Sequence, residues 1–535
     1  MSETAGAPTS PAREDGTGGA RRWFGRRPGS VAIDVAIATL LAAAAFVVHP
    51  LSYALHHPLW LDEAWVATLA RAPWSRAYAL SSSTPLGWLF LVRLVPGGRG
   101  EQLRLVPISF SAAAVAAAFV VGRSLPWRTT TYQRVAGVVI ALTVLLAPAS
   151  LARNDLKQYT ADAFFAIVLV GLASRAEGTP GPRTLGELVV GSIVAMAFST
   201  VAAFVALALF SGLFFSALAA RSKERVVTVL IGAGLVAVTT GVYFALVVVP
   251  RTNSRLRAYW NGLYLPSSPI RVAQGSWHRL ATIAPALGVP VIIAVGLFAA
   301  GCVTCARIGR PGLAVALVLL WIEMIVLAML RRYPFLDLRT SQFLLTVSLV
   351  LIAVGLLGII EFVLARRRWL AIAIAVASAT LYVHGAAPYI RARTMPNEDV
   401  RSATTYVARH RRPGDIIVVT VPSSYGFSYY WPGGRIEYAS DEAVSTGFVT
   451  RVSGLGDVVY VNGLSSKDTT GAMRRALAAS RTADGSRIWI VRSHLFQSEG
   501  AAWQQTFREL GRHPFSLQVG TEPLWVYART APIGS

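Results

Sequence analysis

The sequence predicts a polytopic α-helical membrane protein of about 11 transmembrane helices, followed by a C-terminal extracytoplasmic α/β domain. Of its 535 residues, 54% are hydrophobic and only 14% are charged, and the mean hydropathy is +0.51. Soluble proteins carry about 25% charged residues. Apolar stretches of roughly 18 residues or more recur between Val31 and Pro388, and each can cross a hydrocarbon layer about 30 Å thick.

The distribution of charge is that of a membrane protein. The chain carries 50 Lys and Arg against 27 Asp and Glu, a formal net charge of +23. Many of the arginines lie in short loops between apolar stretches, so the positive-inside pattern explains the charge and nucleic-acid binding is set aside. The two cysteines, Cys302 and Cys305, lie within one apolar stretch and are interpreted as small core thiols.

The N-terminal part fixes the predicted orientation. Residues 1–29 are rich in small residues and are predicted to be a disordered cytoplasmic N-terminus. The arginines in 21–27 precede the first span, about 31–54, which places them inside. The large first outer loop, 55–101, contains an apolar piece, Pro85–Val95, that is too short to span. We predict an interfacial or re-entrant helix there, because counting it as a span would invert every later loop.

The later spans alternate between basic inner loops and outer loops. We place them at about 103–122, 135–152 and 160–174, two within 185–220, then 226–249, one ending at Arg307, 312–330, one ending at Arg366, and 370–388. Every short loop on the predicted cytoplasmic side is basic, which makes eleven spans self-consistent. The predicted transmembrane domain covers 30–390 and delivers the remaining chain to the outer side.

The composition changes from about 395 onward. Strand-like runs such as Ile416–Val421 and Ile488–Val491 alternate with helical stretches, and a strand pair is expected around Phe515–Tyr527. This alternation predicts a small layered α/β domain over 395–535. No glycine-rich phosphate loop follows the first strand, since Pro422–Gly426 is a poor substitute. We interpret the domain as a cap or acceptor-binding module without a catalytic site.

Three polar segments on the predicted outer side contain the residues that could take part in catalysis or substrate binding. Asp62 and Glu63 lie between tryptophans just after the first span, although a helix N-terminus would also favour two acids there. The second segment is Lys157–Asp162 and the third is Arg331–Arg339. Cations at the outer face oppose the positive-inside bias, and either an anionic substrate or ordinary lipid headgroups would explain them.

These segments belong to an ordered series of short motifs. The series is Leu61-Asp62-Glu63-Ala64-Trp65, Thr84–Trp88, Leu103–Pro107, Ala147-Pro148, Tyr159–Asp162, and Arg332-Tyr333-Pro334 with Arg339. In order and in shared outward orientation it resembles the GT-C superfamily of membrane glycosyltransferases. The closest likeness is to the protein O-mannosyltransferase and lipid A aminoarabinose transferase branch. The resemblance covers roughly residues 30–390, and no single motif in it is highly specific.

The resemblance implies an inverting glycosyltransferase of the outer face of the plasma membrane. Such an enzyme transfers a hexose or pentose from a polyprenyl-phosphate donor to a cell-envelope glycan, lipid or protein. In the family, an acid of the first outer loop deprotonates the acceptor hydroxyl. Asp62 occupies that position, and Glu63 is the second choice. A positioned carboxylate base contributes roughly 10²–10⁴-fold to the rate.

The resemblance also implies a substrate-binding set. The predicted residues are Lys157, Tyr159, Asp162, Arg332, Tyr333 and Arg339. The cations of this set would stabilise the departing lipid phosphate. His49, His56 and His57 fit no strong ligand pattern, so no metal site is predicted. No cofactor is indicated, and a divalent cation is compatible with the pattern without being required by it.

Two other classes of protein stay open at this point. A transporter or flippase would need broken helices or internal repeats that place polar groups at mid-membrane. A non-catalytic envelope-assembly protein would have its active part in the C-terminal domain. A structure in which Asp62 faces lipid, or which lacks a cavity beneath the first loop, would favour this last class.

Overall fold

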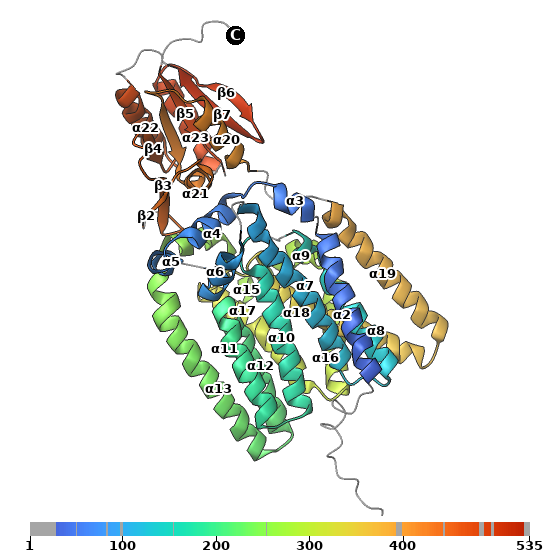
Figure 1. Ribbon diagram of the computed structural model, residues 1–535. Helices are drawn as coiled ribbons and strands as arrows, with labels where there is room; N and C mark the ends of the chain where they lie inside the picture. Colours follow the sequence, from blue (N-terminus) through green and yellow to red (C-terminus); the bar gives the residue numbers. More distant parts are fainter. Residues whose placement is uncertain are drawn as a thin grey trace, which may run out of the picture.

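The computed structural model describes residues 28–49, 51–81, 84–96, 100–152, 155–252, 254–391, 398–441, 444–480, 486–493 and 497–528. Almost all of the predicted disordered N-terminus lies outside these residues, and so do Arg153 and Asn154. A helical part runs as far as Arg391, and an α/β part begins at Val400 (Figure 1). The predicted fold class is thereby confirmed. The proposed domain boundary between 390 and 395 falls mostly on residues outside the described ranges.

Each predicted span falls on a helix. These are α2 (Pro28–Val48), α7 (Leu105–Ser124), α8 (Thr130–Leu145), α10 (Tyr159–Gly178), α11 (Pro182–Phe198), α12 (Ala202–Ala219), α13 (Lys223–Tyr243), α16 (Val291–Arg307), α17 (Pro311–Met329), α18 (Gln342–Leu364) and α19 (Arg368–Arg391). By length and composition, eight helices in the described ranges can cross a membrane, or nine if a bent pair that includes α16 counts as one span. The chain is therefore a multi-pass membrane protein. The count of eleven stays a prediction, because α8 and α11 have only 16 and 17 residues.

Short helices gather at one end of the bundle. Before α10 they are α3 (Leu51–His56), α4 (Leu61–Arg71), α5 (Trp74–Leu80), α6 (Leu86–Leu94), η1 (Gly100–Arg104) and α9 (Pro148–Ala152). After α13 they are η2 (Phe244–Val248, a π-helix), η3 (Val249–Arg251), α14 (Ser254–Tyr259), η4 (Asn261–Leu263), α15 (Pro269–Ile283) and η5 (Ala284–Leu287). The predicted non-spanning piece is the nine-residue α6, which packs on α4 and α11 and buries Trp88.

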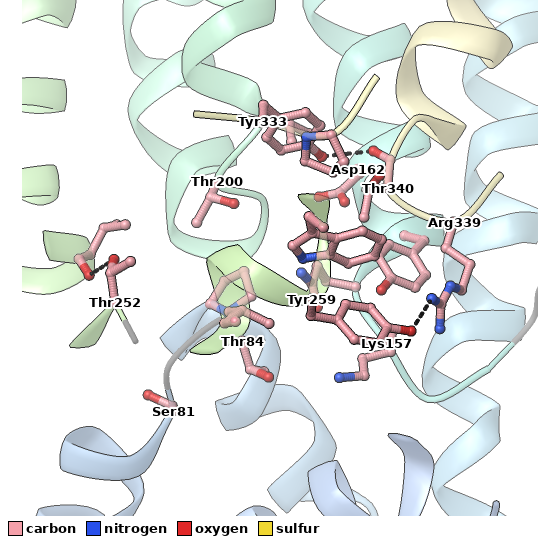
Figure 2. Close-up of a pocket in the computed structure, with 18 of the residues that line it drawn as sticks. Ser81, Thr84, Lys157, Asp162, Thr200, Thr252, Tyr259, Tyr333, Arg339 and Thr340 are labelled. Carbon is pink, nitrogen blue, oxygen red and sulfur yellow. Dashed lines mark hydrogen bonds between the residues drawn. The ribbon is translucent and has the colours of Figure 1, made fainter. Parts of the chain in front are cut away.

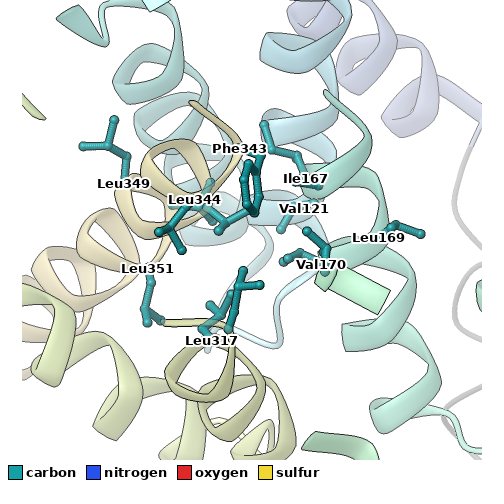
Figure 3. Packing of buried hydrophobic residues seen from close by; sticks show 14 of the residues in the cluster. Val121, Ile167, Leu169, Val170, Leu317, Phe343, Leu344, Leu349 and Leu351 are labelled. Carbon is teal, nitrogen blue, oxygen red and sulfur yellow. The ribbon is translucent and has the colours of Figure 1, made fainter. Parts of the chain in front are cut away.

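The core of the bundle lies around α10 and α18. Of the most apolar stretch of α18, 78% is buried inside the protein, whereas only 6% of the corresponding stretch of α2 is. Figure 3 shows Phe343 and Leu344 of α18 close to Ile167 and Val170 of α10. Small residues bring α16 and α18 together, since a Cβ atom on Gly355 would lie 2.1 Å from the Leu297 carbonyl oxygen.

The C-terminal part is a three-layered α/β unit. Its elements are α20 (Val400–His410), β1 (Ile416–Thr420), α21 (Val421–Tyr430), β2 (Ile436–Ser440), β3 (Phe448–Val452), β4 (Val458–Val461), α22 (Ser466–Ala479), β5 (Arg487–Val491), α23 (Gln497–Glu509), β6 (Phe515–Val519) and β7 (Glu522–Ala528). The sheet has the order β4-β1-β5-β7-β6, with β1 parallel to β4 and β5, and β7 antiparallel to β5 and β6. Helices α20 and α21 cover one face and α22 and α23 the other, which explains the unbroken apolar run of β1.

Two details of this unit could not be taken from the sequence. Pro422–Gly426, a poor match to a phosphate-binding loop, lies in α21, where a proline is tolerated in the first turn. The antiparallel hairpin β2–β3 was not predicted. Phe448 of this hairpin packs with Trp65 of α4 and Tyr425 of α21. The α/β unit therefore rests on the end of the bundle that holds α3 to α6 (Figure 1).

Candidate functional site

A cavity of about 300 Å³ lies at the end of the bundle beneath the C-terminal unit. Its walls come from α4, from the start of α10, from the segment between α13 and α15, and from the loop between α17 and α18. Figure 2 shows Lys157, Tyr259 and Arg339 close together, with Ser81 and Thr252 farther along the cavity. The segments before α6 and α12 and the loop of the β2–β3 hairpin also contribute, so the fold collects polar residues from many separate parts of the sequence.

Seven of the eight predicted site residues line this cavity. They are Asp62, Lys157, Tyr159, Asp162, Arg332, Tyr333 and Arg339. Asp62 therefore faces a cavity beneath the first loop, which is not the arrangement expected of a non-catalytic assembly protein. The structure brings the residues together, while their roles in catalysis and binding stay predictions.

Asp62 and Arg339 form the central ion pair of the cavity. Arg339 Nη1 donates to Asp62 Oδ2 over 3.0 Å, and its Nη2 lies 3.3 Å from the Tyr259 hydroxyl. Asp337 accepts the backbone N–H of Arg339 over 3.1 Å and holds the loop in shape. Burial lowers the pKa of Arg339, but the nearby Tyr159, Asp62 and Asp337 outweigh burial and raise that pKa, so the guanidinium stays charged.

Lys157 is a buried cation that forms no ion pair with any described residue. Its side chain is 4% exposed, and Nζ lies 3.5 Å from the centre of the Trp65 ring. Burial lowers the pKa of Lys157, Asp62 and Asp155 partly oppose this, and Arg339 adds to it. A buried ammonium group without a contacting counter-ion is costly. An anionic ligand in the cavity would supply that counter-ion.

Asp162 and Tyr333 form a deeper wall of the cavity. Asp162 lies in the first turn of α10, and its Oδ1 has no hydrogen-bond partner among the described residues. The Tyr333 hydroxyl donates to the Thr340 carbonyl over 2.7 Å. Burial, with the charges of Asp162 and Asp337, raises the pKa of Tyr333, so its phenol is neutral. This wall offers a free acceptor and an aromatic ring to a ligand.

Glu63 is the predicted residue that the structure places elsewhere. It is fully buried and forms an ion pair with Arg104, whose Nε lies 2.8 Å from Oε1. Glu63 also accepts the backbone N–H of Leu156 over 3.1 Å, and so ties α4 to the segment that carries Lys157. Successive helical residues point about 100° apart, and Asp62 lines the cavity while Glu63 turns away from it toward Arg104. A catalytic role for Glu63, the second choice after Asp62, stays a prediction.

Several lining residues were missed by the sequence analysis. Arg251 and Arg257 line the cavity from the segment after α13, and Ser445 and Thr446 reach it from the loop of the β2–β3 hairpin. Arg251 donates to the Ser81 hydroxyl. The two arginines follow a predicted outward span, so the same violation of the positive-inside bias could have revealed them. The hairpin residues carry no comparable signal.

The cavity has an excess of positive charge. The lining cations among the described residues are Lys157, Arg251, Arg257, Arg332 and Arg339, and the lining acids are Asp62 and Asp162. A concave site lined by one sign of charge concentrates ligands of the opposite sign. The site is therefore suited to a negatively charged ligand with a polar, hydroxyl-bearing portion.

Comparison with solved structures bears on the fold. The chain matches ArnT from Cupriavidus metallidurans bound to undecaprenyl phosphate with a TM-score of 0.50 and 13% sequence identity, over 95% of this chain and 100% of that chain. ArnT is a lipid A aminoarabinose transferase of the GT-C type. The chain has the GT-C fold. The family resemblance seen in the sequence motifs is thus confirmed at the level of fold.

Other comparisons extend less far. An oligosaccharyltransferase from Archaeoglobus fulgidus in complex with zinc and sulfate matches with a TM-score of 0.47 and 13% identity, over 74% of this chain. The chain spans 61% of the length of that enzyme. No protein-family model and no curated protein sequence matches the chain. The fold assignment therefore rests on the similarity to ArnT.

Proposed function

We propose that the chain is an inverting glycosyltransferase that moves a sugar from a polyprenyl-phosphate donor to a hydroxyl of a cell-envelope glycan, lipid or protein. The observation that carries this proposal is the meeting of the carboxylate of Asp62 with the buried Lys157 and the half-buried Arg339 in one cavity. The fold supports it, since the similar ArnT structure is bound to undecaprenyl phosphate.

In the proposed reaction Asp62 is the general base. The acceptor oxygen forms a bond to the anomeric carbon while the bond from that carbon to the donor phosphate oxygen breaks, and the electron pair leaves with the phosphate. Attack from the face opposite the phosphate inverts the configuration. Asp62 Oδ2 is engaged by Arg339, whereas Oδ1 has no hydrogen bond to the described residues and takes the acceptor proton.

In the same proposal the cations hold the leaving group. Negative charge grows on the polyprenyl phosphate as the glycosidic bond breaks, and preorganised cations in a water-poor site stabilise it. Lys157 supplies an ammonium group that forms no ion pair with a described residue, and Arg339 supplies a planar fork of donors. Arg332 is exposed at the rim, where it would meet the phosphate as the donor enters.

The sugar would contact the deeper wall. Asp162 Oδ1 is available to accept from a sugar hydroxyl, and Tyr159 and Tyr333 offer rings and neutral hydroxyls. Such groups bind a neutral polyhydroxylated ring by hydrogen bonds and packing. They would fix the distance from the anomeric carbon to Asp62 without taking part in proton transfer.

We also propose an orientation for the chain. The N-terminus would be cytoplasmic, and the unit of residues 395–535 would be extracytoplasmic, on the same side as the site. The loops between α7 and α8, α10 and α11, and α12 and α13, taken with the adjoining helix ends, are basic and lie at the end of the bundle opposite to that unit (Figure 1). Basic short loops favour the cytoplasmic side.

The decisive experiment measures turnover of a panel of radiolabelled polyprenyl-phosphate sugars by purified protein. Asp62→Asn keeps the size of the side chain but cannot accept the proton, so we expect transfer to fall by about 10²- to 10⁴-fold with donor binding retained. Asp468→Asn, on the exposed first turn of α22, is the matched control and should behave as wild type.

The two possible failures have different meanings. Full transfer by Asp62→Asn with its true donor would remove Asp62 from the role of base. Failure of the wild-type protein to bind any donor of the panel would contradict the proposed class of enzyme.

A further inference from the structure

The peptide that leads into Asp62 is held by side chains from distant parts of the chain. Residues 57–60 form no regular secondary structure. Arg104 donates to the carbonyls of Ala54, His57 and Pro58 over 2.6, 2.5 and 2.8 Å. Because no helix or strand sets this backbone, its conformation depends on those side chains.

Two of the side chains that hold this peptide come from the C-terminal unit. The N–H of Leu59 donates to the Tyr430 hydroxyl over 2.9 Å. The N–H of Leu61 donates to Glu398 Oε2 over 3.0 Å. Glu63 accepts the N–H between them over 3.4 Å. Three consecutive amides therefore have side-chain acceptors, and the next residue along the chain is Asp62.

Glu398 meets a requirement of the helix that carries Asp62. Leu61 is the first residue of α4, and the first N–H groups of a helix have no partner within it. A carboxylate at this end satisfies one of these donors and interacts favourably with the helix dipole. Within the helix Glu63 accepts the N–H of the cap residue Trp60, and Glu398 supplies the acceptor for the next N–H from a distant part of the chain.

The second contact from the C-terminal unit, between Tyr430 and Leu59, belongs to a larger hydrogen-bond network. The Tyr430 hydroxyl donates to Glu101 over 3.0 Å, which leaves its oxygen free to accept from Leu59. Glu101 is buried and also pairs with Arg401 over 2.8 Å. Arg401 reaches on to the His56 carbonyl over 3.1 Å. The contact between the two parts is therefore a connected polar network.

We propose that Glu398 is a positioning residue for the transfer reaction, and that the C-terminal unit thereby sets the place of the base Asp62. The inference rests on the proposed function of Asp62. Glu398 does not line the cavity, so it acts through the first turn of α4 and does not touch the substrate. A displacement of about 1 Å at a catalytic group can cost about 10²-fold in rate.

The test compares Glu398→Ala with Glu398→Gln in the full-length protein. Glu398→Ala removes the acceptor, and we expect kcat to fall about 10- to 100-fold while KM for the donor changes less than about twofold. Glu398→Gln keeps an amide oxygen that can accept from Leu61 and should restore most of kcat. Glu437→Ala, on the exposed side of β2, is the control and should match wild type.

Three outcomes would overturn the inference. They are an unchanged kcat in Glu398→Ala, a raised KM without a loss of kcat, and a Glu398→Gln variant as slow as Glu398→Ala with an equally lowered Tm. Asp62→Asn assayed beside them separates the two proposals. An inactive Asp62→Asn with a fully active Glu398→Ala removes only the positioning role, whereas an active Asp62→Asn removes the base itself.

Discussion

Single residues in the cavity carry charge that the protein does not fully neutralise. Lys157 is buried against Trp65 without an ion pair to a described residue. Arg339 forms an ion pair with Asp62. Burial of such groups is costly unless a ligand contributes the opposite charge. At the scale of the residue, the charges of the cavity are those that the proposed anionic donor would neutralise.

The titration of Lys157 gives a prediction for pH. Only its charged form attracts the single negative charge of a polyprenyl-phosphate sugar. Because burial lowers its pKa, it loses the proton below the ordinary lysine value of about 10.4. We expect the Kd for the donor to rise as pH rises through that lowered pKa. Kd measured in nanodiscs across this range should show the rise.

The control for this titration is Lys157→Met. It keeps the apolar stem but has no charge, so it should bind the donor more weakly and show no such rise in Kd. A rise of equal size in Lys157→Met would assign the titration to another group.

The residue scale also shows what could be read from the sequence. Lys157, Asp162 and Arg332 stand at outer ends of apolar stretches, where the bilayer alone gives no reason for charge, and this made them visible. Glu63 is, like its neighbour Asp62, an acid at the outer end of an apolar stretch. The two differ in the structure because α4 turns Asp62 to the cavity and Glu63 to Arg104, and neither fact can be read from one sequence.

At the scale of elements, the bundle depends on close approach between helices. The hydrophobic effect does not drive helices together in lipid. Small residues at the contact favour association because they allow tight van der Waals packing. Gly301 and Gly355 do this between α16 and α18, where added Cβ atoms would lie 2.2 and 2.1 Å from carbonyl oxygens of the other helix. α18 lines no part of the cavity wall itself, but the loop before it carries Arg339.

The prediction at this scale concerns Gly355→Ala. The added methyl group would force α16 and α18 apart, which costs roughly 1–3 kcal/mol for overpacking. We expect a lower melting temperature in detergent and a partial loss of activity through Arg339. Gly296→Ala, on α16 with no atom within 4 Å of the added group, should melt at or above the wild-type temperature. Equal melting of the two variants would contradict this packing.

Elements differed in how well the sequence predicted them. The spans and the central strands follow from long apolar runs, which need no knowledge of neighbours. The hairpin β2–β3 was missed because its strands, Ile436–Ser440 and Phe448–Val452, mix polar with apolar residues and pack on another part of the chain. Whether such short strands form depends on tertiary contacts, and the local sequence pattern does not reveal those contacts.

The whole molecule places its α/β unit directly over the site. The unit contributes Ser445 and Thr446 to the cavity wall and binds the loop before Asp62 through Glu398 and Tyr430. A cap that only covered the site would need no contact with that loop. The two parts therefore share the wall of one cavity, although the sequence predicts them as separate domains.

The orientation of this body can be tested by labelling. In a variant with Cys302→Ala and Cys305→Ala, we would place single cysteines by Ser516→Cys, on the exposed edge strand β6, or Lys223→Cys, at the start of α13. A membrane-impermeant maleimide added to intact cells should label the first and spare the second. Labelling of the second alone would reverse the proposed orientation.

The long-range contacts of the first loop have a consequence for the time course of biosynthesis. Leu59 and Leu61 depend on partners 371 and 337 residues further along the chain. At roughly 5–20 residues per second, a ribosome needs about 20 s to a minute to supply those partners after the loop has emerged. We expect the nascent protein to be inserted in the bilayer but to have lowered activity until the segment from Glu398 to Tyr430 has been made.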